Sequence, residues 1–407
     1  MAEGSATRKD LLADPEDFTI VLGGPLYQLL RRAHLSGNAL ELANRRIIVA
    51  AVITWVPLLA LSVMQGRALG DTIAVPFLRD VDAYARFLLV VPLLVAAELK
   101  VHTRIRTVAR QFLERELIPA SEQERFDAAM ESTRRWRNSI VAEIGMIVFV
   151  YAVGVGLIWR HVTSLAASTW YATPTADGLN LSYAGWWYVY ISVPLAQFLL
   201  LRWYYRIFIW ARFLWQTSRL NLHLVATHPD RFGGLGFLSL TPVAFSPLVL
   251  AHSVLASAWM ANRILLHQAS LLDFKIEIGA LAAWLALLVF GPLLVFWRKL
   301  QQTWYRGEQE YGPLAERYVH DFERKWVKGD LAPRHELLGT SDIQSLADLA
   351  NAYAIIRSMV FVPITRRAAT QLAITAAIPF LPLLLTLMPL NELLKRLMGL
   401  MLGRPGG

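Results

Sequence analysis

The 407-residue chain contains no cysteine. This absence excludes disulfide bonds, thiolate metal sites and iron–sulfur clusters, and it leaves histidine and carboxylates as the strong metal ligands. Charged residues make up only 17% of the chain, below the roughly 25% of a soluble domain. The sequence also lacks a strand pattern of any length, a phosphate-binding P-loop and a Gly-x-Ser-x-Gly elbow. We therefore expect no strands, no cofactor and no metal, and the missing motifs favour a function other than catalysis.

Long apolar runs are what the chain has instead. A helix needs about 20 apolar residues to cross roughly 30 Å of hydrocarbon. The sequence therefore predicts an all-α fold: a polytopic transmembrane helix bundle of about seven spans with a small helical cytoplasmic layer. The expected spans are 47–64, 84–101, 139–159, 186–204, 242–262, 278–297 and 371–390. Of these, the second is the least regular, because only Phe87–Ala97 is free of charge.

The basic residues follow the positive-inside rule. Of the 40 Lys and Arg residues, nine lie between Lys100 and Arg137 and eleven between Arg298 and Arg367, whereas residues 161–185 contain none. This alternation predicts a cytoplasmic N-terminus. Topology and anionic membrane lipids account for the formal charge of +9, so we expect no nucleic acid as a partner. The first apolar run starts too late for a cleaved signal peptide and is expected to anchor the chain.

The runs divide the chain into five regions. Residues 1–46 form a cytoplasmic segment, in which 26–35 resemble an amphipathic helix on the membrane or docked on the protein. Residues 47–297 hold the first six spans and their loop helices, and 298–370 form a cytoplasmic helical region. Residues 371–390 are a seventh span or a re-entrant hairpin, and 391–407 an amphipathic tail. Capping boxes at Ser121 and Ser341 predict two helix starts in the long loops.

Prolines interrupt most of the predicted spans. A proline removes a backbone donor and tends to kink its helix, which a membrane bundle tolerates when neighbouring groups satisfy the freed carbonyl. Kinked helices can act as gates, although proline is also common in ordinary transmembrane helices. The prolines are Pro57, Pro92, Pro194, Pro247, Pro292, Pro379 and Pro382.

Three ionisable side chains lie at one predicted depth. Glu98, Glu143 and Arg202 belong to three different spans, each within about two turns of the predicted cytoplasmic boundary. Ionisable groups within spans are costly and are therefore candidates for function. The functional interpretation is an inner gate or ion-binding ring. The structural alternative is an ion-pair cluster that ties three helices together.

Two polar side chains fall deeper in the spans. His252 lies near the middle of its predicted span, and Gln197 lies close to Pro194. Either residue can line a pore, and the histidine can relay a proton. The alternative is a buried neutral histidine that forms a hydrogen bond to a neighbouring helix.

The segment His228–Leu238 is the most distinctive loop. Its glycines permit tight turns, and His228, Asp230 and Arg231 can present a donor and charge cluster to a ligand. The alternative is a structured turn in which Asp230 caps backbone groups and Arg231 binds lipid phosphate. The candidate binding residues are therefore His228, Asp230 and Arg231, and no catalytic residue is assigned.

Two segments carry a resemblance to known sequences. HPDRFGGLGFL (His228–Leu238) and LGTSDIQSLADLANAY (Leu338–Tyr353), followed by a proline-broken run and NELLKRL (Asn391–Leu397), resemble segments of uncharacterised bacterial polytopic inner-membrane proteins. This resemblance covers about the second half of the chain. It implies a bacterial inner-membrane location and carries no catalytic residue over.

Three functions remain open. The first hypothesis is an oligomeric channel or passive transporter for ions or small solutes, because kinked helices and sparse interior charges accompany an absence of enzyme motifs. The second is a membrane-anchored sensor or scaffold whose cytoplasmic helices bind a protein partner. The third is a lipid-modifying or intramembrane enzyme that uses His228, Asp230 and Arg231. The sequence specifies neither the substrate, nor the gating stimulus, nor the number of subunits.

Overall fold

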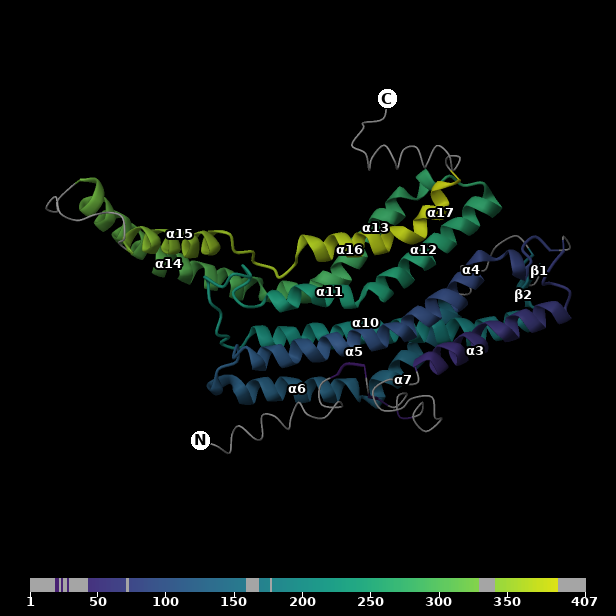
Figure 1. Ribbon diagram of the computed structural model, residues 1–407. Coiled ribbons are helices and arrows are strands. Elements are labelled where there is room, and N and C mark those ends of the chain that lie inside the picture. Colours follow the sequence, from purple (N-terminus) through teal and green to yellow (C-terminus); the bar gives the residue numbers. More distant parts are fainter. Residues whose placement is uncertain are drawn as a thin grey trace, which may run out of the picture.

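The computed structural model describes residues 19–21, 23–24, 28, 43–70, 73–158, 168–175, 178–328 and 341–386. Most of these residues are helical, and the long helices run along one axis of the molecule (Figure 1). The α-helices are α3 (Ala43–Met64), α4 (Val81–Tyr84), α5 (Val91–Glu114), α6 (Gln123–Arg137), α7 (Ile140–Phe149), α9 (Tyr183–Trp187), α10 (Val193–Ser218), α11 (Thr241–Ala244), α12 (Ser246–His267), α13 (Lys275–Phe290), α14 (Trp297–Phe322), α15 (Asp342–Arg357), α16 (Arg366–Ala377) and α17 (Leu381–Leu384). The all-α prediction is confirmed.

Shorter helical turns connect or continue these helices. The 3₁₀ turns are η2 (Phe77–Arg79), η4 (Ala120–Glu122), η7 (Gly236–Leu240), η8 (Leu271–Phe274), η9 (Gly291–Phe296) and η11 (Ile378–Phe380). The π-helical turns are η3 (Ala85–Val90), η5 (Val150–Ile158), η6 (Tyr188–Ser192) and η10 (Glu323–Val327).

One small hairpin corrects the expectation that the chain has no strands. Strand β1 (Ala172–Thr175) pairs antiparallel with β2 (Gly178–Leu181), with Ala172 opposite Leu181. Each strand has four residues, which is too short for an alternating apolar pattern to stand out in the sequence. The hairpin lies at the end of the bundle where α3 ends (Figure 1).

The apolar helices match most of the predicted spans. Five described helices are long and apolar enough to cross a membrane, or six if a pair bent by 44° forms one span. They are Asn44–Met64, Tyr183–Ser218, Gly236–Leu265, Leu271–Val327 and Arg366–Leu384, and the bent pair is Ala120–Arg137 with Ile140–Gly156. The predicted span 84–101 is absent from this group because three charged residues interrupt it: Arg86, Glu98 and Lys100.

Two of the prolines follow π-helical turns. Pro92 lies at the start of α5 directly after η3, and Pro194 lies at the start of α10 directly after η6. A proline cannot donate to the carbonyl one turn back and its ring clashes there, so the wider π turn lets the helix continue past it. Helical structure therefore runs without a break from Val81 to Glu114 and from Tyr183 to Ser218.

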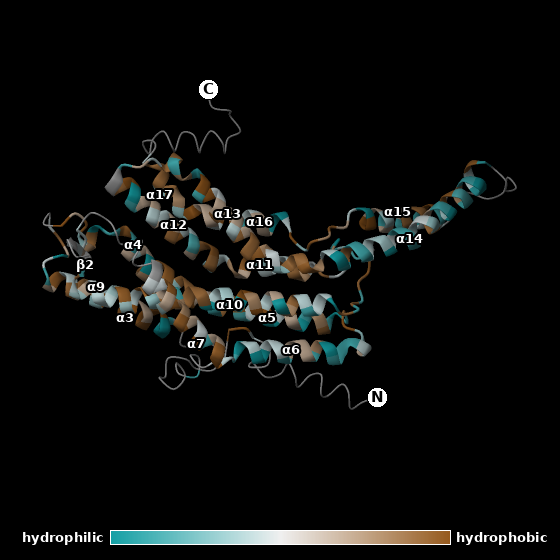
Figure 2. Ribbon diagram, turned by 180° about the vertical axis from the view of Figure 1, so that it is seen from behind, coloured by the Kyte–Doolittle hydropathy of each residue, from teal (hydrophilic) through white to brown (hydrophobic). Residues whose placement is uncertain are grey.

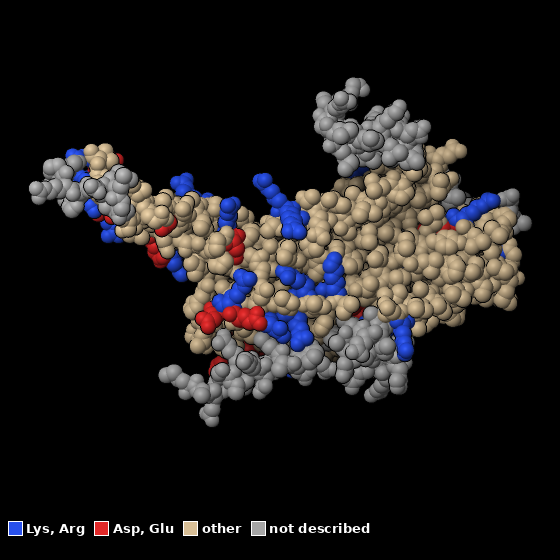
Figure 3. All heavy atoms as spheres, viewed as in Figure 1, with Lys and Arg blue, Asp and Glu red and all other residues tan. Residues whose placement is uncertain are grey.

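The long helices form a packed bundle. Helix α12 contacts α5 on one side and α16 on the other, and α10 contacts α6 and η9. Where α5, α10 and η9 meet, the fully buried rings of Phe112, Phe213 and Phe296 belong to one apolar core. In Figure 2 the hydrophilic colour is most evident along α6 and α14, and most of the Lys and Arg side chains visible in Figure 3 lie over the same part of the molecule.

The two predicted capping boxes are wrong, although both helices exist. Helix α6 follows Glu122, whose carboxylate accepts hydrogen bonds from Asn221 and Arg125. Helix α15 follows Ser341, which makes no side-chain cap. In both motifs the acidic residue directly after the serine, Glu122 or Asp342, forms a hydrogen bond to a residue far from it in the chain.

Helices α14 and α15 lie side by side and extend beyond the bundle as an arm (Figure 1). Lys325 Nζ and Trp326 Nε1 donate to Asp342 Oδ2, and the hydrogen bond from Lys325 lowers the pKa of this carboxyl below its usual value. Tyr353 Oη donates to Glu308 Oε2. The predicted amphipathic segments 26–35 and 391–407 fall outside the described residues, apart from residue 28.

A substitution at Gly307 tests how the arm packs against the rest of the protein. A methyl group at Gly307 of α14 would lie 2.5 Å from Cβ of Ala226, a distance that requires one backbone to move. We expect Gly307→Ala to lower the free energy of unfolding by about 1–3 kcal/mol. Gly312→Ala on the same helix is the control, because its nearest neighbour is Tyr353 Oη at 3.9 Å. Unfolding in a single detergent should separate the two variants, and equal stability would refute this contact.

Candidate functional site

A carboxylate on α5 joins two other helices. Glu98 Oε1 accepts a hydrogen bond from Arg206 Nη2 of α10 at 2.8 Å, and Glu98 Oε2 accepts one from Arg46 Nη1 of α3 at 2.5 Å. Arg202, one turn before Arg206, places Nη1 3.7 Å from the same carboxylate. A single acidic side chain therefore holds arginines from both neighbours.

A second carboxylate extends this cluster to α7. Glu143 Oε1 lies 3.8 Å from Arg202 Nη2. The structure thus brings Glu98, Glu143 and Arg202 together, as their depth in the spans predicted. Two further arginines, Arg46 and Arg206, belong to the same cluster, and the sequence pattern did not identify them. We call these five residues the Glu98 cluster.

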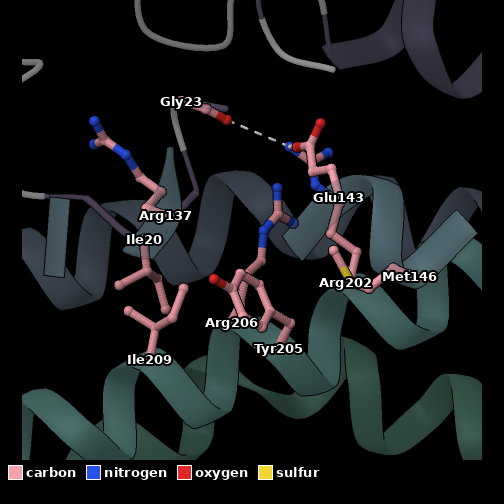
Figure 4. Close-up of a pocket in the computed structure, with 9 residues that line it drawn as sticks. All are labelled: Ile20, Gly23, Arg137, Glu143, Met146, Arg202, Tyr205, Arg206 and Ile209. Carbon is pink, nitrogen blue, oxygen red and sulfur yellow. Dashed lines mark hydrogen bonds and ion pairs between the residues drawn. The ribbon is translucent and has the colours of Figure 1, made fainter. Parts of the chain in front are cut away.

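The Glu98 cluster is buried. Each of its five residues is at most 8% exposed. The backbone carbonyls of Val21 and Gly23 accept from Arg206 and Arg202 at 3.3 and 3.5 Å, and Figure 4 shows both arginines extending from α10 towards Gly23. The ring of Trp203 lies 4.8 Å from the Arg206 guanidinium carbon. Removing one partner from such a cluster leaves an uncompensated buried charge, which costs about 3–5 kcal/mol.

A small cavity adjoins the cluster. Its volume is about 10 Å³, and its lining includes Arg202, Arg206, Glu143 and Met146 (Figure 4). Such a space holds roughly one water-sized particle. Arg46 does not line this cavity, and its buried Nε and Nη2 groups have no hydrogen-bond partner among the described residues.

His252 takes part in a separate interhelical contact. Its Nδ1 lies 2.8 Å from the carbonyl oxygen of Leu248, and its Nε2 lies 2.6 Å from Tyr204 Oη on α10. A carbonyl only accepts, so in the neutral ring Nδ1 carries the proton and Nε2 accepts from the tyrosine. This geometry fits the structural interpretation of a neutral histidine that joins α12 to α10.

Gln197 packs against a glycine of η5. A Cβ at Gly154 would lie 2.3 Å from Gln197 Oε1, so a methyl group there would make the glutamine side chain move. The Oε1 atom is buried and has no hydrogen-bond partner among the described residues. Its role in a pore stays a prediction.

In the loop His228–Leu238, which we call the HPDR loop, Asp230 binds backbone amides. Its Oδ1 accepts from the amides of Phe232 at 2.8 Å and Gly234 at 3.2 Å, and its Oδ2 accepts from the amide of Gly236 at 2.7 Å. His228 Nδ1 lies 3.2 Å from the amide of Asp230. Because three amides occupy the carboxylate, this arrangement fits the structured turn rather than a ligand site.

The same loop ties distant segments together. Arg231 is exposed and has a φ of +61°, and its carbonyl accepts from the amide of Val360. Arg104 of α5 donates to the carbonyl of Phe237 at 2.6 Å. The loop therefore joins α5 to the segment after α15. Ligand binding by His228, Asp230 and Arg231 stays a prediction.

A second polar cluster was not found from the sequence. Asp80 Oδ1 accepts from Asn262 Nδ2 of α12 at 2.9 Å, and Asp80 Oδ2 accepts from Trp170 Nε1 at 2.9 Å. Beside it, Arg86 Nη2 of η3 lies 2.7 Å from Asp82 Oδ2. We call these residues the Asp80 network.

Aromatic rings surround the Asp80 network. Trp170 is fully buried and meets Phe77, Tyr171 and Tyr188 at centroid distances of 4.9 to 5.1 Å. Asp80 also caps α4, because its side chain accepts from the amides of Asp82 and Ala83. Nothing local pointed to Trp170 or Asn262, because both lie far from Asp80 along the chain.

Comparison of the chain with protein-family models, curated proteins and solved structures finds no match. The resemblance to bacterial inner-membrane proteins therefore stays a prediction, and function has to be argued from the geometry of this chain.

Substitutions at Asp230 and Arg231 test whether Asp230 stabilises the loop. We expect Asp230→Ala to lower the free energy of unfolding by about 1–3 kcal/mol, because three amides lose their acceptor. Arg231→Gly should not destabilise the protein, because glycine adopts a positive φ without strain. Denaturant unfolding of the two variants measures this difference. Unchanged stability of Asp230→Ala would instead favour a binding role for this residue.

Proposed function

We propose that this chain is a subunit of an oligomeric channel or passive transporter for ions or small solutes, in a bacterial inner membrane with its N-terminus in the cytoplasm. The observation that carries this proposal is the Glu98 cluster, in which one buried carboxylate holds arginines from two other helices. A buried ion-pair cluster ties helices together only while its partners stay in place, so it can serve as a latch between them.

The position of the two polar clusters supports a membrane-spanning assembly. Asp80 caps the helical stretch that contains Glu98 18 positions later, a separation of roughly 25–30 Å along the axis that is close to the hydrocarbon thickness of a bilayer. Between them the only charges are Asp82 and Arg86, close to the Asp80 end. This spacing suits an arrangement in which one cluster lies at each face of the membrane.

The helices of the cluster contain points where bending is easy. The π-helical turn η3 precedes α5, η5 follows α7, and η6 precedes α10. Mid-helix π turns weaken the regular hydrogen-bond ladder and often mark functional sites. If the Glu98 cluster opens, these turns give the three helices a place to move.

Helix α13 supports lipid or subunit contacts. Of its 16 residues only Leu285 and Val289 are buried, while Ile276, Trp284 and Leu287 are exposed. A helix that is apolar on every side and exposed within one chain needs lipid or another subunit around it. This face suits an oligomer in a membrane.

Flux measurements test the proposal. Glu98→Asp keeps the buried charge but shortens its reach, so we expect proteoliposomes with this variant to pass ions or small solutes several-fold faster than wild type. The control is Glu114→Asp on the same helix, whose exposed contact with Arg110 at 3.8 Å should contribute little. No flux under any ion or solute gradient, in wild type and Glu98→Asp alike, would refute a channel.

The arm supports the second candidate, a membrane-anchored scaffold. Exposed apolar side chains lie along α14, η10 and α15, among them Tyr305, Leu314, Val327 and Ile343. Exposed apolar positions on a projecting helix pair suit a protein partner. The third candidate, an enzyme using His228 and Asp230, gains no such support because backbone amides occupy the Asp230 carboxylate.

Cross-linking tests the second candidate function, the membrane-anchored scaffold. A photoreactive residue in place of Leu314 should capture a partner protein in cells if the arm is a docking surface, whereas the same residue at exposed Leu240, outside the arm, should not. Mass spectrometry of the adducts identifies what was captured. Equal labelling at both positions, or adducts with lipid alone, would contradict the scaffold function.

A further inference from the structure

A short segment near the N-terminus lies inside the bundle, although it belongs to no helix or strand. Its described residues are 19–21, 23 and 24, and we call them the strap. The side chains of Ile20 and Val21 are at most 2% exposed and belong to the same apolar core as residues of α5 and α10. The strap is therefore packed between helices and does not lie on the surface.

The arginines of α10 bind the backbone of the strap. Arg206 Nη2 donates to the carbonyl of Val21 at 3.3 Å, and Arg202 Nη2 donates to the carbonyl of Gly23 at 3.5 Å. Both arginines belong to the Glu98 cluster, so the strap contacts this cluster directly.

Other helices bind the strap at its two ends. Arg137 Nη1, at the end of α6, donates to the carbonyl of Thr19 at 3.0 Å. His102 Nδ1 of α5 lies 2.8 Å from the hydroxyl oxygen of the same threonine. The amide of Gly24 donates to Asn138 Oδ1 at 3.1 Å. Side chains of α5, α6 and α10 therefore hold the strap in place together.

Two glycines allow the strap to approach the helices closely. Gly23 has a φ of +142° and Gly24 a φ of +89°, and side chains rarely permit either conformation. A Cβ at Gly23 would collide with the side chain of Arg137, and a Cβ at Gly24 would lie 2.7 Å from Glu143 Oε1. The bound position of the strap therefore depends on glycine.

The strap covers the cavity beside the Glu98 cluster. Ile20 and Gly23 form part of the cavity wall, and Arg137, Arg202 and Ile209 line it from the helices (Figure 4). Without the strap this small space would become part of a cleft that is open to solvent and lined by arginines.

Release of the strap leaves the ion pairs beneath it in place. A neutral carbonyl at 3.3–3.5 Å is a weaker partner for a guanidinium than a carboxylate. If the strap leaves, Arg206 keeps its contact with Glu98 at 2.8 Å. Arg202 likewise keeps Glu143 at 3.8 Å. Release therefore avoids the large cost of leaving a buried charge without an ionic partner.

We propose that the strap is a releasable lid over the arginine-lined cleft. It detaches while the helices stay folded, and its release exposes Arg202 and Arg206 to solvent. This inference goes beyond the proposed transport function, because it concerns how the Glu98 cluster is covered. Its test requires no flux, so its failure and the failure of the transport function are distinguishable.

Thiol labelling of the full chain in a non-ionic detergent measures release. The chain has no cysteine, so a single introduced cysteine is the only thiol. Val21→Cys reports on the strap, and Ile209→Cys reports on the cleft beneath it. Leu214→Cys is the control, because this residue is fully buried on the same helix as Ile209 but does not line the cavity.

Local release exposes the first two positions without global unfolding. With each rate normalised to that of the same variant in denaturant, a water-soluble maleimide should label Val21→Cys and Ile209→Cys at similar rates. Both rates should be at least about tenfold higher than that of Leu214→Cys.

A matched pair of glycine variants tests the bound position. In the Val21→Cys and Ile209→Cys backgrounds, Gly23→Ala should raise the labelling rate about tenfold, because alanine strains the bound strap. Gly70→Ala is the control, since Gly70 also has a positive φ, +108°, but a Cβ there meets no atom within 4 Å. It should leave both rates unchanged, and neither substitution should accelerate Leu214→Cys.

Three results would overturn the inference. Labelling of Val21→Cys as slow as that of Leu214→Cys would show that the strap opens only when the whole protein unfolds. Fast labelling of Val21→Cys with slow labelling of Ile209→Cys would show that the strap does not cover the cleft. Equal acceleration by Gly23→Ala and Gly70→Ala would point to general destabilisation.

Discussion

The pairing of buried Glu98 with arginines from α3 and α10 is the interaction on which the rest of this structure depends. A carboxylate in an apolar bundle is stable only with positive partners and hydrogen bonds, and each arginine in turn needs the carboxylate. Glu98 accepts from Arg46 and Arg206 at the same time, so the positions of three helices are linked through one side chain. Glu143 adds α7 through Arg202.

A second constraint acts at the other end of α5 and η3. Asp80 binds Trp170 from the segment before β1 and Asn262 from α12. Between the Glu98 cluster and the Asp80 network, the helices pack through apolar side chains, which set no unique register by themselves. The two polar clusters thus specify how α5 is aligned against α3, α10 and α12, and the apolar core supplies most of the burial.

Prolines were predicted to kink their helices, and in the structure a π-helical turn precedes two of them. Pro92 and Pro194 each follow a π-helical turn inside an uninterrupted helical stretch. The extra residue in a π turn makes room for the proline ring, so the helix continues past the proline. Neighbouring helices can satisfy the groups that such a turn leaves free, and Ser192 of η6 donates to the carbonyl of Thr54 on α3.

Local signals predicted part of the candidate site well. Glu98, Glu143 and Arg202 were identified because charges within apolar runs are rare, and depth along a helix follows from residue number alone. Arg46 and Arg206 were not identified as members of the cluster, because arginines near the ends of apolar runs normally reach solvent or lipid phosphate. In the HPDR loop the residue types were informative, but the sequence left open whether Asp230 faces a ligand or its own backbone.

The sequence by itself determined the helical class, the approximate positions of the apolar helices and the uneven distribution of basic residues. Each of these properties depends on composition and spacing within one segment, over which burial and helix geometry act locally. Tertiary structure alone decided which arginines share Glu98, that Trp170 and Asn262 meet Asp80, and that Asp230 binds three amides. These contacts join residues far apart in the chain, and their geometry depends on how whole helices pack, which no local pattern encodes.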